Sequence, residues 1–323
     1  MASRLIRNTA ILALIETTYG TDANPLPANV IAASNLSINP LNAKWVRREL
    51  IRPYLGGAEE LPGERYVEMS FSVELVGAGT AGTAPAWGPL LRGAGFAEQL
   101  TATTRVDYTP ISVGMESVTL YWYDDGVLHK ARGARAAATL SAKIGEIPKI
   151  SFKFIGLYST ATAASLPTVS YTAFKQPQII LDANTQKLTF GATHSTSGAP
   201  ALAGGTSYPS QGLELDLGLQ AQFTALLGGE TVDITDRDVT GKVVLDLTAA
   251  QEVAYINAVE AGTLSSLGLM HGTVVGNKSL IWCPSTQIRN PQKAEVNGKR
   301  LISFDLRVLP VSGNDEVRIV TSF

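Results

Sequence analysis

Apolar and polar residues alternate along many short segments of this chain, which is the pattern of a β-strand with one buried face. The clearest alternation lies at residues 66–76, where every second residue is apolar: Val67, Met69, Phe71, Val73 and Leu75. Asp125-Gly126, Gly145-Glu146 and Asn297-Gly298 separate neighbouring runs of this kind, and such pairs favour tight hairpin turns. Because short turns join antiparallel strands, the pattern predicts a mainly β protein with mostly antiparallel sheets.

Two short helices are predicted to interrupt the strands, one in each half of the chain. Thr83 is placed to cap a helix that ends near Gly95. Thr248-Ala249-Ala250-Gln251 has the capping-box pattern, and the helix that it opens is expected to stop near Gly262.

The remaining segments are predicted to be irregular. Residues 1–34 begin with a short apolar stretch and predict an N-terminal arm. Trp45–Gly63 and Gly218–Val239 are predicted to be long loops, and the first is dense in charge. A small hairpin is predicted at residues 179–190, followed by a flexible linker of small residues at His194–Ser210.

The two halves of the chain resemble each other. Five pairs of segments match in the same order: Asn35–Asn39 with Gly212–Asp216, Leu55–Glu59 with Leu227–Thr231, Glu68–Leu75 with Lys242–Leu247, Val118–Trp122 with Ser279–Trp282, and Ala142–Phe154 with Ala294–Leu306. The last pair shares the tripeptide Ile-Ser-Phe after a tight turn. A repeat with a period of half the chain indicates a tandem domain rather than a solenoid.

This repeat predicts a domain organisation. Residues 1–165 are expected to form a first domain with an N-terminal arm, residues 166–210 a connecting hairpin and flexible loop, and residues 211–323 a second domain. Each domain is expected to be an antiparallel β-sandwich or partial barrel with one short helix.

Composition limits the function. Charged residues are 17% of the chain, below the usual ~25%, which suggests either that other subunits cover much of the surface or that the surface is polar but uncharged. The net charge is -2 and no basic tract occurs, which argues against tight binding of DNA. The single cysteine, Cys283, allows no intrachain disulfide and suits a reducing cytoplasm. Ala10–Ile15 is too short for a signal peptide or a membrane span, so no membrane anchoring is expected.

Catalytic chemistry is not indicated. The three histidines, His129, His194 and His271, have no second ligand at a zinc-like spacing, and the chain has neither a G-x-S-x-G elbow nor a Walker loop. Glu68, Glu74 and Asp246 lie on wet strand faces, where carboxylates are ordinary. Asp233, Asp236 and Asp238 lack the glycine and terminal glutamate of a calcium loop. We therefore expect no enzyme activity and no cofactor or metal.

Several segments together resemble a known family. They are the opening Met1–Pro25 with Glu16-Thr17-Thr18-Tyr19-Gly20-Thr21, the segment Gly88–Phe96, Asp125-Gly126 followed by Gly133-Ala134-Arg135, and then Gly145, Pro148, Phe152, Phe154 and Gly156. Their order, across nearly the whole chain, resembles the tail tube (major tail) proteins of long-tailed bacteriophages. The resemblance implies strands joined into a large inner barrel, rings stacked into a hollow tube, and passage of genome DNA through that tube without specific binding. It also implies a place in the virion tail, assembly in the host cytoplasm, and contacts with tail terminator, tape measure and distal tail proteins.

The duplication changes the expected ring, because three chains with two tube domains each would supply a six-fold wall. Six chains per ring is the alternative for assembly, and a non-catalytic β-sandwich binding or virion decoration module is the alternative for function. Such a module would need an exposed aromatic platform, whereas Trp45, Trp87, Trp122 and Trp282 are scattered along the chain.

Two sets of residues are predicted to act in assembly. The residues predicted to face the lumen are Glu68, Ser70, Ser72, Glu74, Lys242, Val244, Asp246, Lys153 and Asp305. The residues predicted to contact the next ring are Arg47, Arg48, Arg52, Glu59, Glu60, Asp233 and Asp236. The first set rests on the period of two along strands, in which a slip of one residue reverses every side chain.

Overall fold

A computed structural model describes residues 3–195 and 197–323, so residues 1 and 2 of the expected N-terminal arm lie outside the described part. The first half of the chain contains ten strands and one α-helix: β1 (Thr9–Ile15), β2 (Val30–Ile31), β3 (Ser34–Arg47), β4 (Glu60–Glu74), α1 (Gly88–Arg92), β5 (Phe96–Thr101), β6 (Arg105–Pro110), β7 (Val118–Asp124), β8 (Val127–Lys143), β9 (Lys149–Tyr158) and β10 (Thr162–Ala163). A single 3-10 turn, Pro27–Asn29, precedes β2.

The rest of the chain repeats this mixture of strands and one helix. Four short strands connect the halves: β11 (Leu188–Phe190), β12 (Thr193–His194), β13 (Leu202–Ala203) and β14 (Thr206–Tyr208). The second half contains β15 (Ser210–Asp216), β16 (Leu219–Leu226), β17 (Gly229–Arg237), β18 (Thr240–Leu245), α2 (Ala249–Glu260), β19 (Leu264–His271), β20 (Ser279–Val296), β21 (Lys299–Leu309) and β22 (Arg318–Thr321).

One continuous antiparallel sheet runs through both halves. Its strand order is β3-β4-β9-β8-β15-β18-β21-β20, so each half contributes four neighbouring strands. The halves join where β8 pairs with β15, from Lys143 opposite Gly212 to Thr139 opposite Asp216. The sheet does not close on itself, because β3 and the end of β20 form its two edges.

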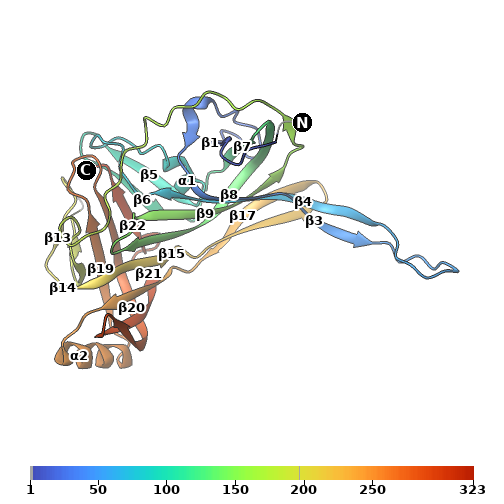
Figure 1. Ribbon diagram of the computed structural model, residues 1–323. Helices are drawn as coiled ribbons and strands as arrows, with labels where there is room; N and C mark the ends of the chain where they lie inside the picture. The colour runs from blue at the N-terminus through green and yellow to red at the C-terminus, as the bar shows by residue number, and fades with distance from the viewer. Residues whose placement is uncertain (1–2, 196) are drawn as a thin grey trace.

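The two longest strands of this sheet, β8 and β20, continue past it into outer layers. The beginning of β8 pairs with β7, which pairs in turn with β1. The beginning of β20 pairs with β19 on one side and with β22 on the other. The β5–β6 hairpin of the first half reaches β22 of the second, with Tyr108 opposite Ile319, so the halves also interlock there. In Figure 1, strands β1, β5, β6 and β7 and helix α1 lie together beside β8 and β9.

A shared hydrophobic core lies between the continuous sheet and the outer layers. The apolar positions predicted from residues 66–76 all face it, and each is at most 2% exposed. Phe71 stacks on Phe154 with ring centroids 5.7 Å apart. In the second half Phe304 meets Tyr255 of α2 at 5.7 Å. Because both halves contribute to one cluster, the core itself ties the repeats together.

The local signals at the three turns and at the cap of the second helix are confirmed, whereas the predicted cap of the first helix is wrong. Hairpins form around Asp125-Gly126, Gly145-Glu146 and Asn297-Gly298. Helix α1 is present, although it is only Gly88–Arg92, and the residue at its N-cap is Trp87 rather than the predicted Thr83. At α2, the Thr248 side chain accepts from the amide of Gln251 and the reciprocal bond is also present, as the capping box predicts.

The two predicted long loops are wrong in detail, because the structure places hairpin arms there. Strands β3 and β4 extend outward as a long arm with its tip at residues 48–59, and β16 and β17 form a shorter arm with its tip at Leu227-Gly228. Both arms leave the body on the same side in Figure 1. The many charges suggested a loop, but in the structure these charged residues pair across the two strands of the hairpin, as Arg47 does opposite Glu60.

Three further expectations are wrong. Residues 179–181 form no strand; β11 pairs instead with β14 and β19, because Leu188 and Phe190 are buried in the shared core. The apolar start of the N-terminal arm is strand β1, held between β7 and β2. Trp122 and Trp282 are not equivalent, since Trp122 lies in β7 whereas Trp282 lies in β20, the counterpart of β8.

Within the described residues, the structure contains no helix of the length and apolar character that crossing a bilayer requires. The two α-helices span five and twelve residues.

Candidate assembly interface

The face of the continuous sheet that is turned away from the hydrophobic core is polar from one edge to the other. Cross-strand pairs place Ser70 opposite Lys153 in the first half, and Lys242 opposite Asp305 in the second. Eight of the nine residues predicted to face the lumen lie on this face: Glu68, Ser70, Ser72, Glu74, Lys153, Lys242, Val244 and Asp305. Asp246 follows β18 directly and forms an ion pair with Lys299. The structure thus brings the predicted set together, in the register that the alternation requires.

This polar face is hollowed and mixed in charge. Ser70, Thr139 and Asp216 help to line an open hollow of about 660 Å³ across the β4, β9, β8 and β15 strands. Ion pairs cross between neighbouring strands at Glu68–Lys153 (3.3 Å) and Glu214–Lys143 (2.6 Å), and Asp238, between β17 and β18, pairs with Arg307 of β21 at 3.2 Å. The lysines and arginines of these pairs are partly neutralised, so the face presents no continuous positive surface for phosphate.

The two edge strands of the sheet each have a counterpart in the other half of the chain, and these two counterparts pair with each other. In the described residues, β3 pairs with β4 on one side and with no strand on the other. Residues 292–296 of β20 pair with β21 on one side only. Inside the chain, the counterparts of these two strands, β15 and β8, pair with each other. Unpaired strand edges are ready templates for another strand, and proteins normally cover or pair them.

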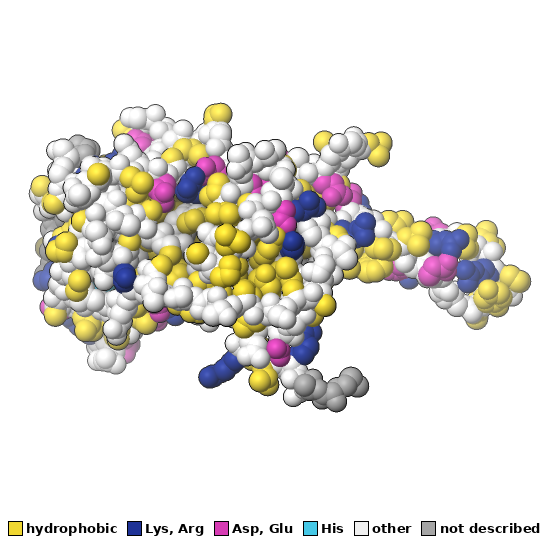
Figure 2. Space-filling view, turned by 90° about the horizontal axis from the view of Figure 1, so that it is seen from above, with side chains coloured by type: hydrophobic (Ala, Val, Ile, Leu, Met, Phe, Trp, Pro, Cys, Tyr) yellow, Lys and Arg dark blue, Asp and Glu magenta, His cyan; other side chains and the backbone are white. Residues whose placement is uncertain are grey.

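The five charged residues of the long arm that were predicted to contact the next ring are paired within the arm. Arg47 lies 3.6 Å from Glu60, Arg52 lies 3.6 Å from Glu59, and Arg48 also forms an ion pair with Glu59. These side chains are largely exposed, so each pair contributes at most about 1 kcal/mol. Figure 2 shows the charged side chains alternating with apolar ones along the projecting arm.

Apolar residues crowd the tips of both arms. On the long arm Ile51 and Leu55 are fully exposed, and on the short arm Leu227 is too. The arms touch each other nearer the body, where Tyr66 stacks on Phe223 at 5.2 Å. The tips therefore offer apolar contact surface held away from the core.

Asp233 and Asp236, predicted to contact the next ring, lie on β17 of the short arm. Asp233 accepts from Arg135 of β8 at 2.6 Å, which anchors the base of the arm to the body. Asp236 accepts from the amide of Arg237 at 2.8 Å. Tyr19 adds a second anchor, because its hydroxyl accepts from the Val232 amide at 2.6 Å.

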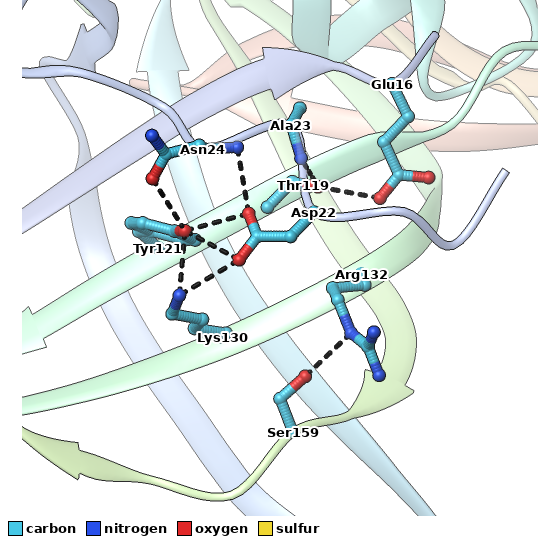
Figure 3. A network of polar contacts seen from close by, with 9 residues as sticks. All are labelled: Glu16, Asp22, Ala23, Asn24, Thr119, Tyr121, Lys130, Arg132 and Ser159. Atoms are coloured by element: carbon cyan, nitrogen blue, oxygen red, sulfur yellow. Dashed lines mark hydrogen bonds and ion pairs between the residues drawn. The ribbon is translucent and has the colours of Figure 1, made fainter. Parts of the chain in front are cut away.

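A polar cluster that the sequence analysis missed binds the segment after β1 to strands β7 and β8 (Figure 3). Asp22 accepts from Tyr121 at 2.7 Å and from Lys130 at 2.9 Å. Burial opposes ionisation of Asp22, but the hydrogen bonds from Lys130 and Tyr121 outweigh it and lower its pKa. The only sequence signal for this cluster was the segment Glu16–Thr21 just before Asp22. That segment contributed to the family resemblance, but the resemblance assigned no role to it.

The described residues contain no group of three or more His, Cys, Asp or Glu side chains placed to hold a metal ion. Cys283 is fully buried, and burial raises the pKa of its thiol to about 12. His271 bonds Thr185 at 2.8 Å and the Gln178 carbonyl at 3.1 Å.

A sheet with one polar face, two strand edges unpaired among the described residues, and projecting hairpins are typical of the class of self-assembling structural proteins. A family model for phage tail tube proteins matches residues 6–308, and the chain belongs to this family. It is therefore a tail tube component of a phage virion. No curated protein matches the chain in sequence.

Proposed function

We propose that three copies of this chain form a ring with pseudo-six-fold symmetry, and that stacked rings form the hollow tube that conducts genome DNA during ejection. One observation carries the proposal. The continuous sheet begins with β3 and ends with β20, and the counterparts of these strands already pair inside the chain as β15 and β8. Repeating that junction between chains adds four strands per half and closes the sheet into a barrel without edges.

The internal junction also predicts the register between chains. Ser141 lies opposite Glu214 where β8 meets β15. Ser141 lies opposite Lys149 of β9, and the equivalent pair in the second half is Ala294 opposite Leu301. Glu214 lies opposite Lys242, and the equivalent pair in the first half is Ser37 opposite Ser70. Ala294 of one chain should therefore lie opposite Ser37 of the next.

Cysteine cross-linking tests the ring directly. A Ser37→Cys/Ala294→Cys variant, oxidised after assembly, should give covalent dimers and trimers and nothing larger, because opposed strand residues have the spacing that a disulfide needs. The matched control Ser37→Cys/Glu295→Cys shifts one residue to the other face and should not cross-link. A ladder that extends to six chains would replace the trimer by the hexamer, and a protein that stays monomeric at high concentration would count against ring formation altogether.

The polar face of the sheet is the proposed wall of the lumen. Glu68, Glu74 and Asp246 would face the channel together with Ser70, Ser72, Lys153, Lys242, Val244 and Asp305. The ion pairs between strands support a role as conduit, because a wall with paired charges gains little from releasing counterions of DNA. DNA would then pass without specific binding.

The two arms are proposed to reach the neighbouring ring and set the stacking. They leave the same side of the body, and contact at opposite ends of a subunit builds an open-ended stack. Because Arg47, Arg48, Arg52, Glu59 and Glu60 are paired within the arm, these charges would stiffen it, and the apolar tips would supply most of the contact.

Assembly in the host cytoplasm and contacts with tail terminator, tape measure and distal tail proteins follow from the family rather than from any surface of this chain. They belong to the same proposal. Copurification of those proteins with tubes of this chain would test them.

A further inference from the structure

The first half carries a small basic socket beside the root of the long arm. An open pocket of about 490 Å³ is lined by Arg65 of β4, by Lys130 and Arg132 of β8, by Asp22, and by hydroxyl residues at and after the end of β9. Figure 3 shows Lys130 and Arg132 side by side on β8, with Arg132 turned toward Ser159.

The two arginines of this socket have little to bind within the chain. Arg132 donates to the Ser159 hydroxyl at 2.9 Å, and Arg65 lies over the Tyr158 ring at 5.5 Å. Lys130, by contrast, has its carboxylate in Asp22. Among the described residues no carboxylate comes within ion-pair distance of Arg65 or Arg132. Two guanidinium groups, each with five donors, thus line a hollow whose carboxylate, Asp22, is already paired with Lys130.

The repeat shows what such an arginine does when a carboxylate is available. Phe71 lies opposite Phe152, and its counterpart Val243 lies opposite Phe304. Six residues before each lie Arg65 and Arg237, respectively. Arg237 forms an ion pair with the buried Glu316 and donates to the Ile111 carbonyl at 2.9 Å. The second half therefore satisfies internally the position that the first half leaves open to solvent.

An acidic knob lies at the other end of the same hairpin. The turn between β8 and β9 carries Glu146. It exchanges backbone hydrogen bonds with Ile180, Gly145 to Ile180 at 2.8 Å and Ile180 to Glu146 at 2.9 Å, and Asp182 follows two residues later in that segment. Both carboxylates are exposed and form no ion pair among the described residues. At a rise of ~3.3 Å per residue, the strand from Arg132 to Lys143 separates socket and knob by roughly 35 Å.

We propose that the Arg65/Arg132 socket binds the Glu146/Asp182 knob of a second copy of this chain in the adjacent ring. This inference rests on the proposed stacking of rings. A socket and a complementary knob at opposite ends of one rigid hairpin make a head-to-tail contact, which propagates as a stack. Opposite charges also fix the orientation, because two like ends repel. Guanidinium groups suit this role, since they bind carboxylates with two parallel hydrogen bonds.

A charge exchange tests the pairing. Arg65→Glu/Arg132→Glu should reduce the protein that sediments as tubes about tenfold or more while native mass spectrometry still finds rings, because like charges then face each other. Glu146→Arg/Asp182→Arg should do the same. The variant with all four substitutions should recover tubes to within about threefold of the unmodified protein, because the pairs are restored with reversed sign. Lys175→Glu, on the outer connecting segment, is the matched charge control and should assemble normally.

The outcomes separate the two proposals. Normal tubes from either reversed pair, or no recovery in the combined variant, would overturn the socket while leaving rings and tubes intact. If the unmodified protein forms no rings, the proposed function and this inference both fail. Should Arg65→Glu/Arg132→Glu not fold, Arg132→Gln provides the same comparison, and its tubes should dissolve at lower salt than those of the unmodified protein.

Discussion

At the scale of single residues, buried polar side chains fix the loops that the apolar pattern leaves undetermined. The Glu16 carboxylate is 7% exposed and accepts four hydrogen bonds of 2.7 Å each. Its donors are the amides of Gly20 and Gly133 and the hydroxyls of Ser117 and Thr119, so one side chain ties the segment after β1 to strands β7 and β8.

Glu16→Gln should therefore destabilise the fold. An amide replaces one acceptor oxygen by a donor, which leaves buried donors facing another donor and costs about 2 kcal/mol. Denaturant unfolding would show a lower midpoint at an unchanged slope. Glu49→Gln makes the same chemical change on the exposed long arm and should leave the midpoint where it was. Equal midpoints for the two variants would show that the Glu16 bonds are replaceable.

His194 makes the stability depend on acid. Both of its ring nitrogens are buried without a hydrogen-bond partner in the described residues, and the ring lies 5.5 Å from that of Trp282. Burial, together with the nearby positive charges of Arg318 and Arg105, lowers the pKa of His194 to about 4 against the opposing charge of Asp107. Its neutral form is therefore the one that the fold accommodates.

The sign of the effect follows from linkage. Because the folded pKa lies below the ordinary value of about 6.5, the unfolded chain binds more protons between these two values. Stability is then complete above about pH 6.5 and falls, by about 3 kcal/mol at most, as the pH drops toward 4. Thermal unfolding across this range should show a smaller loss for His194→Phe than for the unmodified protein. Parallel curves would assign the acid sensitivity to other groups.

At the scale of elements, the sequence predicted those structures whose signals are local. Asn297-Gly298 and the Thr248 capping box need only neighbouring residues, and both were predicted correctly. The arms were missed because Arg47, Arg48, Glu59 and Glu60 look like loop residues until their partners across the hairpin are known. The predicted hairpin at residues 179–190 was wrong because β11 pairs with β14 and β19, which lie further along the chain, and not with a neighbouring strand.

Removing the tip of the long arm tests its role as an element. Deletion of Arg52–Glu60 should leave rings, because β3 still pairs with β4 near the body, but should abolish tubes. The control Arg52→Gln/Glu59→Gln keeps the arm length and removes only the exposed ion pairs of Glu59 with Arg52 and Arg48, so tubes should persist. Electron micrographs of both variants distinguish rings from tubes. Tubes of normal length from the deletion would mean that the arm only lies on the surface.

At the scale of the whole molecule, several segments that match between the two halves lie at corresponding places in one sheet. The matched segments Asn35–Asn39 and Gly212–Asp216 became edge and junction strands, and the Ile-Ser-Phe segments became β9 and β21 at equivalent places in one sheet. The sequence could not show that β8 pairs with β15, because pairing between repeats depends on which edges meet in space. The same limit hid the socket at Arg65, whose neighbours come from three strands.

The arrangement of the sheet also determines which of its faces is turned toward the interior of the tube. If the polar face lines the tube, Glu68 is reachable only through the open ends, whereas the connecting segment at Lys175 lies outside. Glu68→Cys should then react much more slowly with a bulky thiol reagent in assembled tubes than in free rings, and Lys175→Cys should react at similar rates in both. Native Cys283 is fully buried and should stay silent. Equal protection of both positions would indicate general burial in the tube, and fast labelling of Glu68→Cys would place the polar face outside. In that case the buried residues Met69 and Phe71 would still point away from solvent, and the mixed charges of the wall would have no part in the passage of DNA.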